Sequence, residues 1–530
     1  MNTSMTPTEW FEKRIEEISP KQKYAFISAF LIGILTHLPA FVNDMPNHDG
    51  LASVYFDQNM ITSGRWFLTV ACGISSYFTL PWLIGILSLL WVSITCVILV
   101  ELFEIKSPLH AIIISAVFVT FPALATTYAY IYTADGYMFA MFLAVLAVYL
   151  TKRYQKYGYI AGGICLAFSM GSYQAYLSVT MLLALFILCG FYLSEAKTKE
   201  KVFYTFKTIG MGAIGVALYY IILQILLRVE GVKLADYQGI SGMTSLLGDP
   251  ISVIKHIYTD FVAFIIGGNV ISNNIFSIAA FVLLAVLAIV AAFSFANYHS
   301  LFKKPLFYLI VLIVLALVPI FTNVILIISP EVNYHLLMRY QYVIIVLAFL
   351  AGLMKRSEDF SMGSKFDRAG QWIIIAIGLV LSVNYMVTDN IGYSNLQKRY
   401  EKTYAYCLRL ADRIEQTPGY YTGMPVVMIG VVGDWNYPST DLTGDVTSNM
   451  IGMAGDTVCY KPEDYKSFFA NYLGITIDIV NQEIVGDIYL NDERYYELDS
   501  FPGEHCTEVV DGVLYVKTEN ALKITGEKPQ

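Results

Sequence analysis

The chain has 530 residues, of which 56% are hydrophobic and 14% are charged, and its mean hydropathy is +0.56. These values exclude an ordinary soluble globular protein. The formal net charge of −8 argues against a nucleic-acid-binding protein, because such proteins need a basic footprint. The sequence therefore predicts a polytopic membrane protein.

The N-terminal segment and the apolar stretches after it define the membrane portion. Trp10, Phe11, Ile15 and Ile18 share one helical stripe, so we expect residues 1–22 to include an amphipathic helix on the cytoplasmic membrane surface. About eleven apolar stretches follow, each roughly long enough to cross the hydrocarbon core. The first lacks a small-x-small cleavage site, which predicts an anchor and not a signal peptide. The stretches cover residues 24–42, 80–103, 109–130, 136–151, 158–171, 175–193, 208–227, 276–296, 306–328, 340–354 and 371–388.

Positive charges between these stretches predict the orientation. Loops on the cytoplasmic side of membrane proteins carry an excess of Lys and Arg. With the N-terminus inside, the outer loops hold only Arg65, Arg228, Lys233, Lys255 and Arg339. We therefore expect residues 23–389 to form a transmembrane domain with two long outer loops, 43–79 and 228–275. Residues 390–530 would then lie outside the membrane.

The first outer loop carries the densest polar cluster, in Asn43-Asp44 and Asn47-His48-Asp49-Gly50. A carboxylate here suits a general base that deprotonates an acceptor hydroxyl during sugar transfer, since partial burial would raise its pKa. We favour Asp49, because it would open an interfacial helix whose N-terminus stabilises its charge. Asp44 is the alternative base, and His48 is a candidate sugar or acceptor contact. The competing interpretation is that these loop acids are simply solvated.

A second predicted interfacial helix follows the break at Ser63-Gly64, and Arg65 stands at its start. A guanidinium can grip a phosphate with two hydrogen bonds and keeps its charge. His335 and Arg339 lie about one helical turn apart and can face the same phosphate. Arg228 is a weaker candidate of the same kind. Each of these cations has an ordinary alternative role, in which it reaches toward lipid headgroups.

Other polar groups interrupt apolar runs, which membrane proteins rarely tolerate without a reason. Asp135 either ligates a sugar hydroxyl or caps the helix that follows it. Tyr173 and Gln174 either recognise carbohydrate or form a tight connection between two spans. Tyr334, next to His335, completes the predicted set of sugar or acceptor contacts.

After residue 390 the apolar pattern changes to that of an α/β domain. Residues 393–416 predict a charged helix, 425–432 a buried strand, 463–473 a helix and 509–517 a strand pair around Asp511-Gly512. This segment is long enough for its own core. The seven cysteines have no metal-binding spacing. An oxidising compartment would permit one disulfide, between Cys459 and Cys506, although free thiols are equally compatible with the sequence.

The arrangement resembles the multi-spanning bacterial glucosyltransferases that modify surface polysaccharides such as O-antigen, in the GT-C superfamily of lipid-linked sugar transferases. The resemblance rests on Asn43-Asp44, Asn47-His48-Asp49-Gly50, Ser63-Gly64-Arg65-Trp66 and the layout of about eleven spans. It implies an α-helical, GT-C-like membrane domain followed by an extracytoplasmic α/β domain. It also implies an inverting transfer of glucose or a related hexose from an undecaprenyl-phosphate sugar to a cell-surface polysaccharide, at the outer face of the bacterial cytoplasmic membrane.

By the same resemblance, Asp49 or Asp44 would be the base, and Arg65 or Arg339 would hold the lipid phosphate. No cofactor is implied. The first loop has no Asp-x-Asp motif, so metal dependence is not expected, because arginines can stabilise a polyprenyl-phosphate leaving group. The implied partners are the donor lipid, the glycan acceptor, the bilayer, and a companion donor synthase and flippase.

Two other classes of membrane protein would use the same polar groups. A flippase for lipid-linked sugars usually has internal repeats and charges near mid-membrane, neither of which is visible here. A polysaccharide polymerase or ligase, whose donor is a whole lipid-linked oligosaccharide, also needs cations on the outer face. The sequence does not separate that enzyme from a transferase of single sugars.

Overall fold

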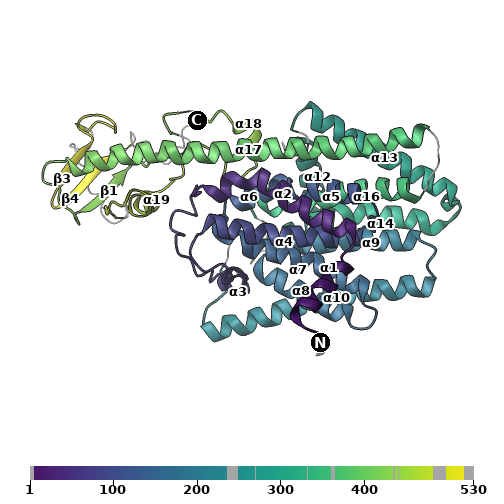
Figure 1. Ribbon diagram of the computed structural model, residues 1–530. Helices are drawn as coiled ribbons and strands as arrows, with labels where there is room; N and C mark the ends of the chain where they lie inside the picture. Colours follow the sequence, from purple (N-terminus) through teal and green to yellow (C-terminus); the bar gives the residue numbers. More distant parts are fainter. Residues whose placement is uncertain are drawn as a thin grey trace.

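The computed structural model describes residues 5–235, 249–268, 270–271, 273–330, 332–359, 365–433, 436–439, 441–480 and 497–518. Most of these residues form a bundle of helices whose axes are roughly aligned, and a small sheet lies beyond one end of the bundle (Figure 1). We call this end of the bundle the C-domain end. The helices of the bundle are α2 (Pro20–Val42), α4 (Pro81–Leu102), α5 (Pro108–Val119), α6 (Pro122–Tyr128), α7 (Ala134–Arg153), α8 (Gly158–Ser172), α9 (Leu177–Leu193), α10 (Thr198–Glu230), α12 (Pro250–Gly267), α13 (Ile275–Tyr298), α14 (Pro305–Thr322), α15 (Ile325–Ile328), α16 (Tyr342–Asp359) and α17 (Lys365–Glu415).

In the part of the chain that the structure describes, nine helices are long and apolar enough to cross a membrane. The number is ten if the bent pair α5 and α6 counts as one span. All of the nine except α12 fall on predicted apolar stretches. The predicted total of about eleven is not confirmed, because α8 has only 15 residues and α16 ends in the charged sequence Lys-Arg-Ser-Glu-Asp.

Helix α12 meets the composition of a span, but it falls within the predicted outer loop 228–275, which would place it along the interface. Its Asp260 binds Arg339, and the carbonyl of Gly268 just beyond it accepts a hydrogen bond of 2.7 Å from Asn449 in the C-terminal domain. Both contacts lie at the C-domain end of the bundle, which favours the interfacial placement.

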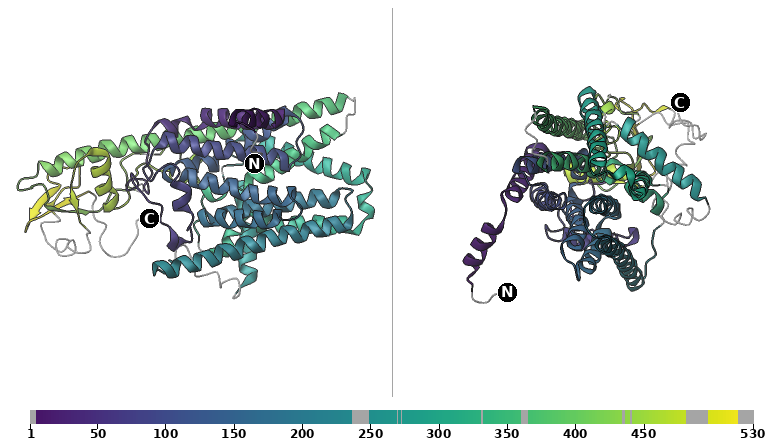
Figure 2. Two further views of the ribbon diagram at one scale, coloured as in Figure 1. Left: turned by 60° about the horizontal axis from the view of Figure 1, so that its bottom comes forward. Right: turned by 90° about the vertical axis from the view of Figure 1, so that its right-hand side faces the viewer.

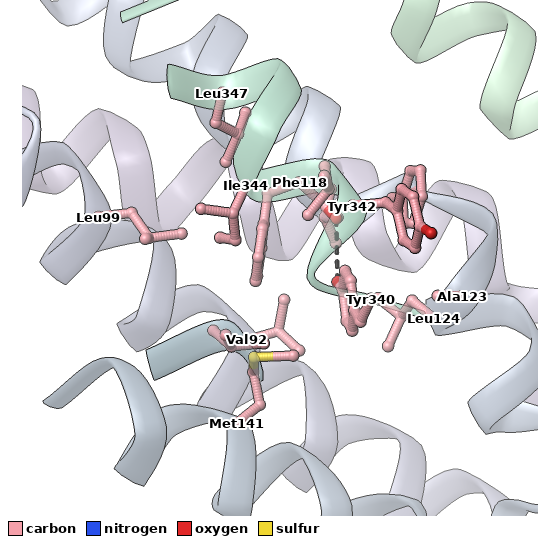
Figure 3. Packing of buried hydrophobic residues seen from close by; sticks show 14 of the residues in the cluster. Val92, Leu99, Phe118, Ala123, Leu124, Met141, Tyr340, Tyr342, Ile344 and Leu347 are labelled. Carbon is pink, nitrogen blue, oxygen red and sulfur yellow. Dashed lines mark hydrogen bonds between the residues drawn. The ribbon is translucent and has the colours of Figure 1, made fainter. Parts of the chain in front are cut away.

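The predicted span 109–130 is broken at Pro122, and its two halves meet at 49°. Proline cannot donate the helical hydrogen bond and restricts the residue before it, so the helix ends there. The freed carbonyls at the end of α5 accept hydrogen bonds from side chains instead. Phe118 O accepts from the Tyr340 hydroxyl at 2.9 Å, and Val119 O accepts from Nε2 of His37 at 2.9 Å. Figure 3 shows Tyr340 within the apolar core around this break.

Helix α1 (Pro7–Glu17) forms within the predicted amphipathic segment and projects away from the bundle, with no buried residue (Figure 2). The first outer loop differs from the prediction. It contains only the 3-10 turn η1 (Ile61–Ser63) and the short helix α3 (Leu68–Cys72). The expected helix after Asp49 is absent from this fully described loop, where separate turns join the N–H of Gly50 to Asn47 O at 3.1 Å and the N–H of Ser53 to Gly50 O at 3.0 Å. The helix-terminus argument for Asp49 is therefore wrong.

The C-terminal domain contains a four-stranded sheet in the order β2-β1-β4-β3, formed by β1 (Pro425–Ile429), β2 (Asp478–Ile479), β3 (Thr507–Val510) and β4 (Val513–Lys517). Strand β1 is parallel to both neighbours, and β3 is antiparallel to β4. The predicted hairpin at Asp511-Gly512 is confirmed, with positive φ at both residues. Helix α19 (Pro462–Phe468) and the π-helical turn η7 (Phe469–Leu473) contribute to a separate core with the end of α17.

The structure contradicts two predictions about this domain. The separate helices expected at 371–388 and 393–416 are parts of one 51-residue helix, α17, which runs from the bundle into the C-terminal domain (Figure 1). All seven cysteines are free thiols, and Cys459 hydrogen-bonds with Cys407 inside the core. The predicted disulfide between Cys459 and Cys506 is therefore not present.

Candidate active site

The acid loop lies between the bundle and the C-terminal domain. Asn47 donates a hydrogen bond of 2.8 Å to the carbonyl of Ala129, next to the end of α6. Gly452 of the C-terminal domain packs against the same place, and a Cβ there would stand 3.2 Å from the Asn47 amide nitrogen. The C-terminal domain therefore forms one wall of the region that contains the predicted base.

Asp49 belongs to a cluster at this boundary. Its Oδ2 lies 3.5 Å from Nε2 of His48, and its side chain is 57% exposed. The His48 ring meets the ring of Tyr460 at 5.2 Å and that of Tyr130 at 6.4 Å. Asp49 also acts electrostatically on Tyr130. The carboxylate thus stands in open space beside a histidine and two phenols, where an acceptor hydroxyl can approach it.

His335 lies on the same side of the bundle, just before the 3-10 turn η6 (Leu336–Met338). Burial lowers the pKa of His335, and the nearby charges of Arg339 and His48 lower it further. The structure therefore brings together His48, Asp49 and His335, which the sequence placed nearly 290 residues apart.

Asp44 has different neighbours. Its carboxylate acts electrostatically on the phenols of Tyr400 and Tyr472, both of which pack in the C-terminal domain. The residue keeps an exposed surface, yet the surrounding atoms raise the pKa of Asp44 by burial. The neighbours of Asp44 therefore differ from those of Asp49.

Arg65 lines a cleft at the C-domain end of the bundle, with an empty volume of about 700 Å³. Its Nη1 donates to the Tyr137 hydroxyl at 3.1 Å, and its guanidinium carbon lies 5.3 Å from the ring centre of Tyr173. The rings of Tyr137 and Tyr173 stack at 4.3 Å. The other residues that line the cleft are Ser63, Gly64, Met170, Gln174, Ala175, Tyr219, Leu223, Leu234, Ile325, Ile328, Ser329, Val332 and Met338.

The backbone before Arg65 is held by two side chains of the bundle. Gln174 donates to the carbonyl of Ser63 at 2.8 Å, and the Tyr219 hydroxyl donates to the carbonyl of Gly64 at 3.2 Å. Gly64 has φ of +78°, which favours glycine. A Cβ at this position would stand 2.6 Å from the Tyr219 hydroxyl. The side-chain NH2 group of Gln174, a predicted sugar contact, therefore holds the loop that carries Arg65.

Tyr132 connects the two halves of the candidate site. Both Asp49 and Arg65 act electrostatically on its phenol. Its ring lies 6.4 Å from that of Tyr130, which faces His48. The acid cluster and the Arg65 cleft thus have tyrosine neighbours in common. This arrangement was not predictable, because interfacial tyrosines are common in membrane proteins and do not stand out in a sequence.

Arg339 is occupied by a partner that the sequence did not identify. Its Nη1 and Nη2 donate to the two carboxylate oxygens of Asp260 at 2.7 and 2.8 Å, and its Nε donates to the carbonyl of Tyr334 at 3.0 Å. The guanidinium also stacks on the Tyr334 ring at 3.7 Å. The available signal in the sequence was one acid within an apolar run, Asp260, and the small number of outer arginines. This geometry assigns Arg339 a structural role more readily than a phosphate-binding role.

The remaining predicted residues are Arg228, Asp135 and Tyr334. Arg228 is exposed in the last turn of α10. Asp135 is buried in the first turn of α7, where its Oδ1 accepts from the N–H of Gly136 at 2.9 Å, but the N-cap of this helix is Thr133. The Tyr334 hydroxyl donates to Thr322 O at 3.2 Å. Among the described residues, no group of three or more His, Cys, Asp and Glu side chains is placed to hold a metal. Independence from metals stays a prediction.

The family model of glucosyl transferase GtrII matches residues 38–354. The chain belongs to this family. A comparison with curated proteins finds no match. The family match begins within α2 and ends within α16, so it contains the acid loop, the Arg65 cleft and Arg339. It leaves out most of α17 and the C-terminal domain. The predicted resemblance to bacterial polytopic glucosyltransferases is confirmed, and the protein is a membrane glycosyltransferase.

Proposed function

We propose that this transferase moves glucose or a related hexose from an undecaprenyl-phosphate sugar to a cell-surface polysaccharide, at the outer face of the bacterial cytoplasmic membrane. The observation that supports this most is the position of Tyr132, whose phenol interacts with both Asp49 and Arg65. A carboxylate and a guanidinium that both act on one phenol suit an acceptor hydroxyl and a lipid phosphate.

In the proposed reaction, Asp49 removes the proton from the acceptor hydroxyl as its oxygen attacks the anomeric carbon. The bond from that carbon to the phosphate oxygen breaks, and undecaprenyl phosphate leaves with the electron pair. Arg65 stabilises the charge on the leaving phosphate through hydrogen bonds from its guanidinium. One displacement of this kind inverts the anomeric configuration. No cofactor takes part in these steps.

The environment of each carboxylate favours Asp49 over Asp44 as the base. Asp49 shares a cluster with His48 and Tyr130, and this cluster continues through Tyr132 toward Arg65. Asp44 faces tyrosines of the C-terminal domain instead. Arg65 is likewise preferred over Arg339, because the latter already binds a carboxylate with both terminal nitrogens.

The C-terminal domain is placed to contribute to acceptor binding. Tyr460 meets the His48 ring, and Asp464 interacts electrostatically with His48. The distribution of Lys and Arg supports an extracytoplasmic position for this domain. The donor would then be made by a companion synthase and delivered to the outer leaflet by a flippase.

Transfer assays in proteoliposomes test the proposal. With undecaprenyl-phosphate glucose as donor, Asp49→Asn should lower kcat by roughly 10²–10⁴-fold, the usual contribution of a general base. Asp44→Asn should keep most of the activity and serves as the matched control. If both variants transfer sugar at the wild-type rate, the assignment of the base is wrong. Consumption of a lipid-linked oligosaccharide in place of the single-sugar donor would indicate a polymerase or ligase, and movement of the donor without transfer would indicate a flippase.

A further inference from the structure

A second cavity lies within the apolar part of the bundle. It is a groove with an empty volume of about 1710 Å³, bounded by α9, α10 and α14, with a contribution from α8. Helix α9 contacts both α10 and α14, and lies between them (Figure 1). The groove follows α9 from Leu177 to Tyr192. At 1.5 Å per residue this is roughly 22 Å, most of the thickness of the hydrocarbon core.

The lining of this groove offers almost no polar atom to a ligand. The hydroxyls of Thr180, Thr205 and Thr208 each donate to a helix carbonyl. The Tyr192 hydroxyl hydrogen-bonds with Thr205 at 3.0 Å. Most other lining residues are aliphatic, such as those on α14. Because its polar groups are already satisfied, the groove suits a long hydrocarbon chain and not a sugar.

The groove begins where the Arg65 cleft ends. On α8, Met170 lines the cleft, and Leu166, one turn away, lines the groove. On α10, Tyr219 lines the cleft and Val216 lines the groove. The turn η3 (Gln174–Tyr176) at the cleft leads directly into α9. Helices α8 and α10 therefore line both the Arg65 cleft at the C-domain end and the groove in the apolar part of the bundle.

We propose that this groove binds the polyprenyl chain of the donor lipid while Arg65 holds its phosphate. The inference rests on the proposed function, because it assigns a place to the apolar part of that same donor. A lipid with a phosphate head and a long unsaturated tail matches the cationic cleft and the apolar groove in their observed order. The groove would fix the depth and direction of the donor, and so align its anomeric carbon with the acid cluster.

Two glycines permit a matched test. Gly212 lines the groove on α10, and Gly190 lies on α9 outside the groove lining. An added Cβ at either position meets no atom within 4 Å, so both accept a larger side chain. Phenylalanine also has a higher helix propensity than glycine, by a few tenths of a kcal/mol. Gly212→Phe should therefore fill the groove without unfolding the protein, and Gly190→Phe is its control.

The assay compares undecaprenyl-phosphate glucose with geranyl-phosphate glucose, whose short chain does not extend along the groove. Gly212→Phe should raise KM for the long donor by roughly ten-fold or more, a change of about 1.4 kcal/mol, and leave KM for the short donor unchanged. Gly190→Phe should match the wild type with both donors. Equal KM ratios for Gly212→Phe and wild type would overturn the inference, since an annular lipid then fills the groove. Absence of transfer by the wild type from either donor would instead contradict the proposed function.

Binding supplies an independent measurement. Undecaprenyl phosphate with a photoreactive group at the far end of its chain should label peptides of α9 or α14 in the wild type. Gly212→Phe should reduce this labelling, and Gly190→Phe should not. Labelling confined to other helices would show that the chain runs elsewhere.

Discussion

Replacing Asp260 with alanine is expected to destabilise the bundle strongly, because it removes the counter-ion of a buried arginine. The Arg339 side chain is 8% exposed and that of Asp260 is 19% exposed, and two short hydrogen bonds join them. Breaking a buried ion pair by removing one partner costs about 3–5 kcal/mol. The aromatic faces of Tyr334 and Phe264, at 3.7 and 4.6 Å, still stabilise the cation. These two contacts are present with and without Asp260, so they do not reduce the difference, and we expect a loss of about 3–5 kcal/mol.

Thermal or denaturant unfolding of the purified protein in detergent measures this loss. Lys255→Ala on the same helix is the control, because the Lys255 side chain is exposed and its removal should change stability by no more than about 0.5 kcal/mol. The double variant Asp260→Leu with Arg339→Met removes both charges. It should recover most of the stability, since apolar residues often replace a buried ion pair without net cost.

The double variant also separates the two roles of Arg339. If the residue is structural, the refolded double variant should transfer sugar with a donor KM near that of the wild type. If Arg339 holds the donor phosphate, as the resemblance implied, the double variant should be stable and fail to bind the donor. Unchanged stability of Asp260→Ala alone would refute the reasoning from the ion pair.

Two further predictions concern the candidate site. Gln174→Leu should raise donor KM by roughly ten-fold with a smaller effect on kcat, because the loop that carries Arg65 loses its hydrogen bond to Ser63 O; an unchanged KM would show that the amide does not position this loop. The lowered pKa of His335 favours its neutral form in the folded state. The contribution of neutral His335 to the free energy of unfolding is therefore complete above pH 6.5, and it is lost as the pH falls through the folded-state pKa. The melting temperature should therefore fall less between pH 7 and pH 5 in His335→Gln than in wild type, and identical pH profiles would contradict this.

The membrane helices were predictable because the length and hydropathy of each apolar stretch identify it without information from the rest of the chain. The breaks within them were harder to predict. Pro122 splits one expected span, since proline ends a helix even in an apolar run. Residues 389–392 were expected to separate two helices, yet α17 continues through them. Gly392 there packs against Met450 and Met453 of the C-terminal domain, so tertiary contacts override its weak helix propensity.

The candidate site was predictable in its residues and not in its pairings. Asp49, His48 and Arg65 stood out because polar side chains are rare among apolar helices. The pairing of Arg339 with Asp260 joins positions 79 residues apart, and no local pattern encodes it. The preference for Asp49 rested on a helix that does not form. It now rests on the neighbours of the carboxylate, which only the folded chain brings together.

The family match ends at residue 354, but the candidate site extends further. Arg399 on α17 is fully buried, and its guanidinium donates to the carbonyls of Gly452 and Thr457 and to the Tyr460 hydroxyl. These bonds fix the segment that places Tyr460 beside His48. Under the proposed function, the donor side of the site lies within the family-matched bundle, and the C-terminal domain, which the family match leaves out, forms one wall of the acceptor side. Changes in the 452–460 segment should accordingly alter the use of acceptors more than the use of the donor.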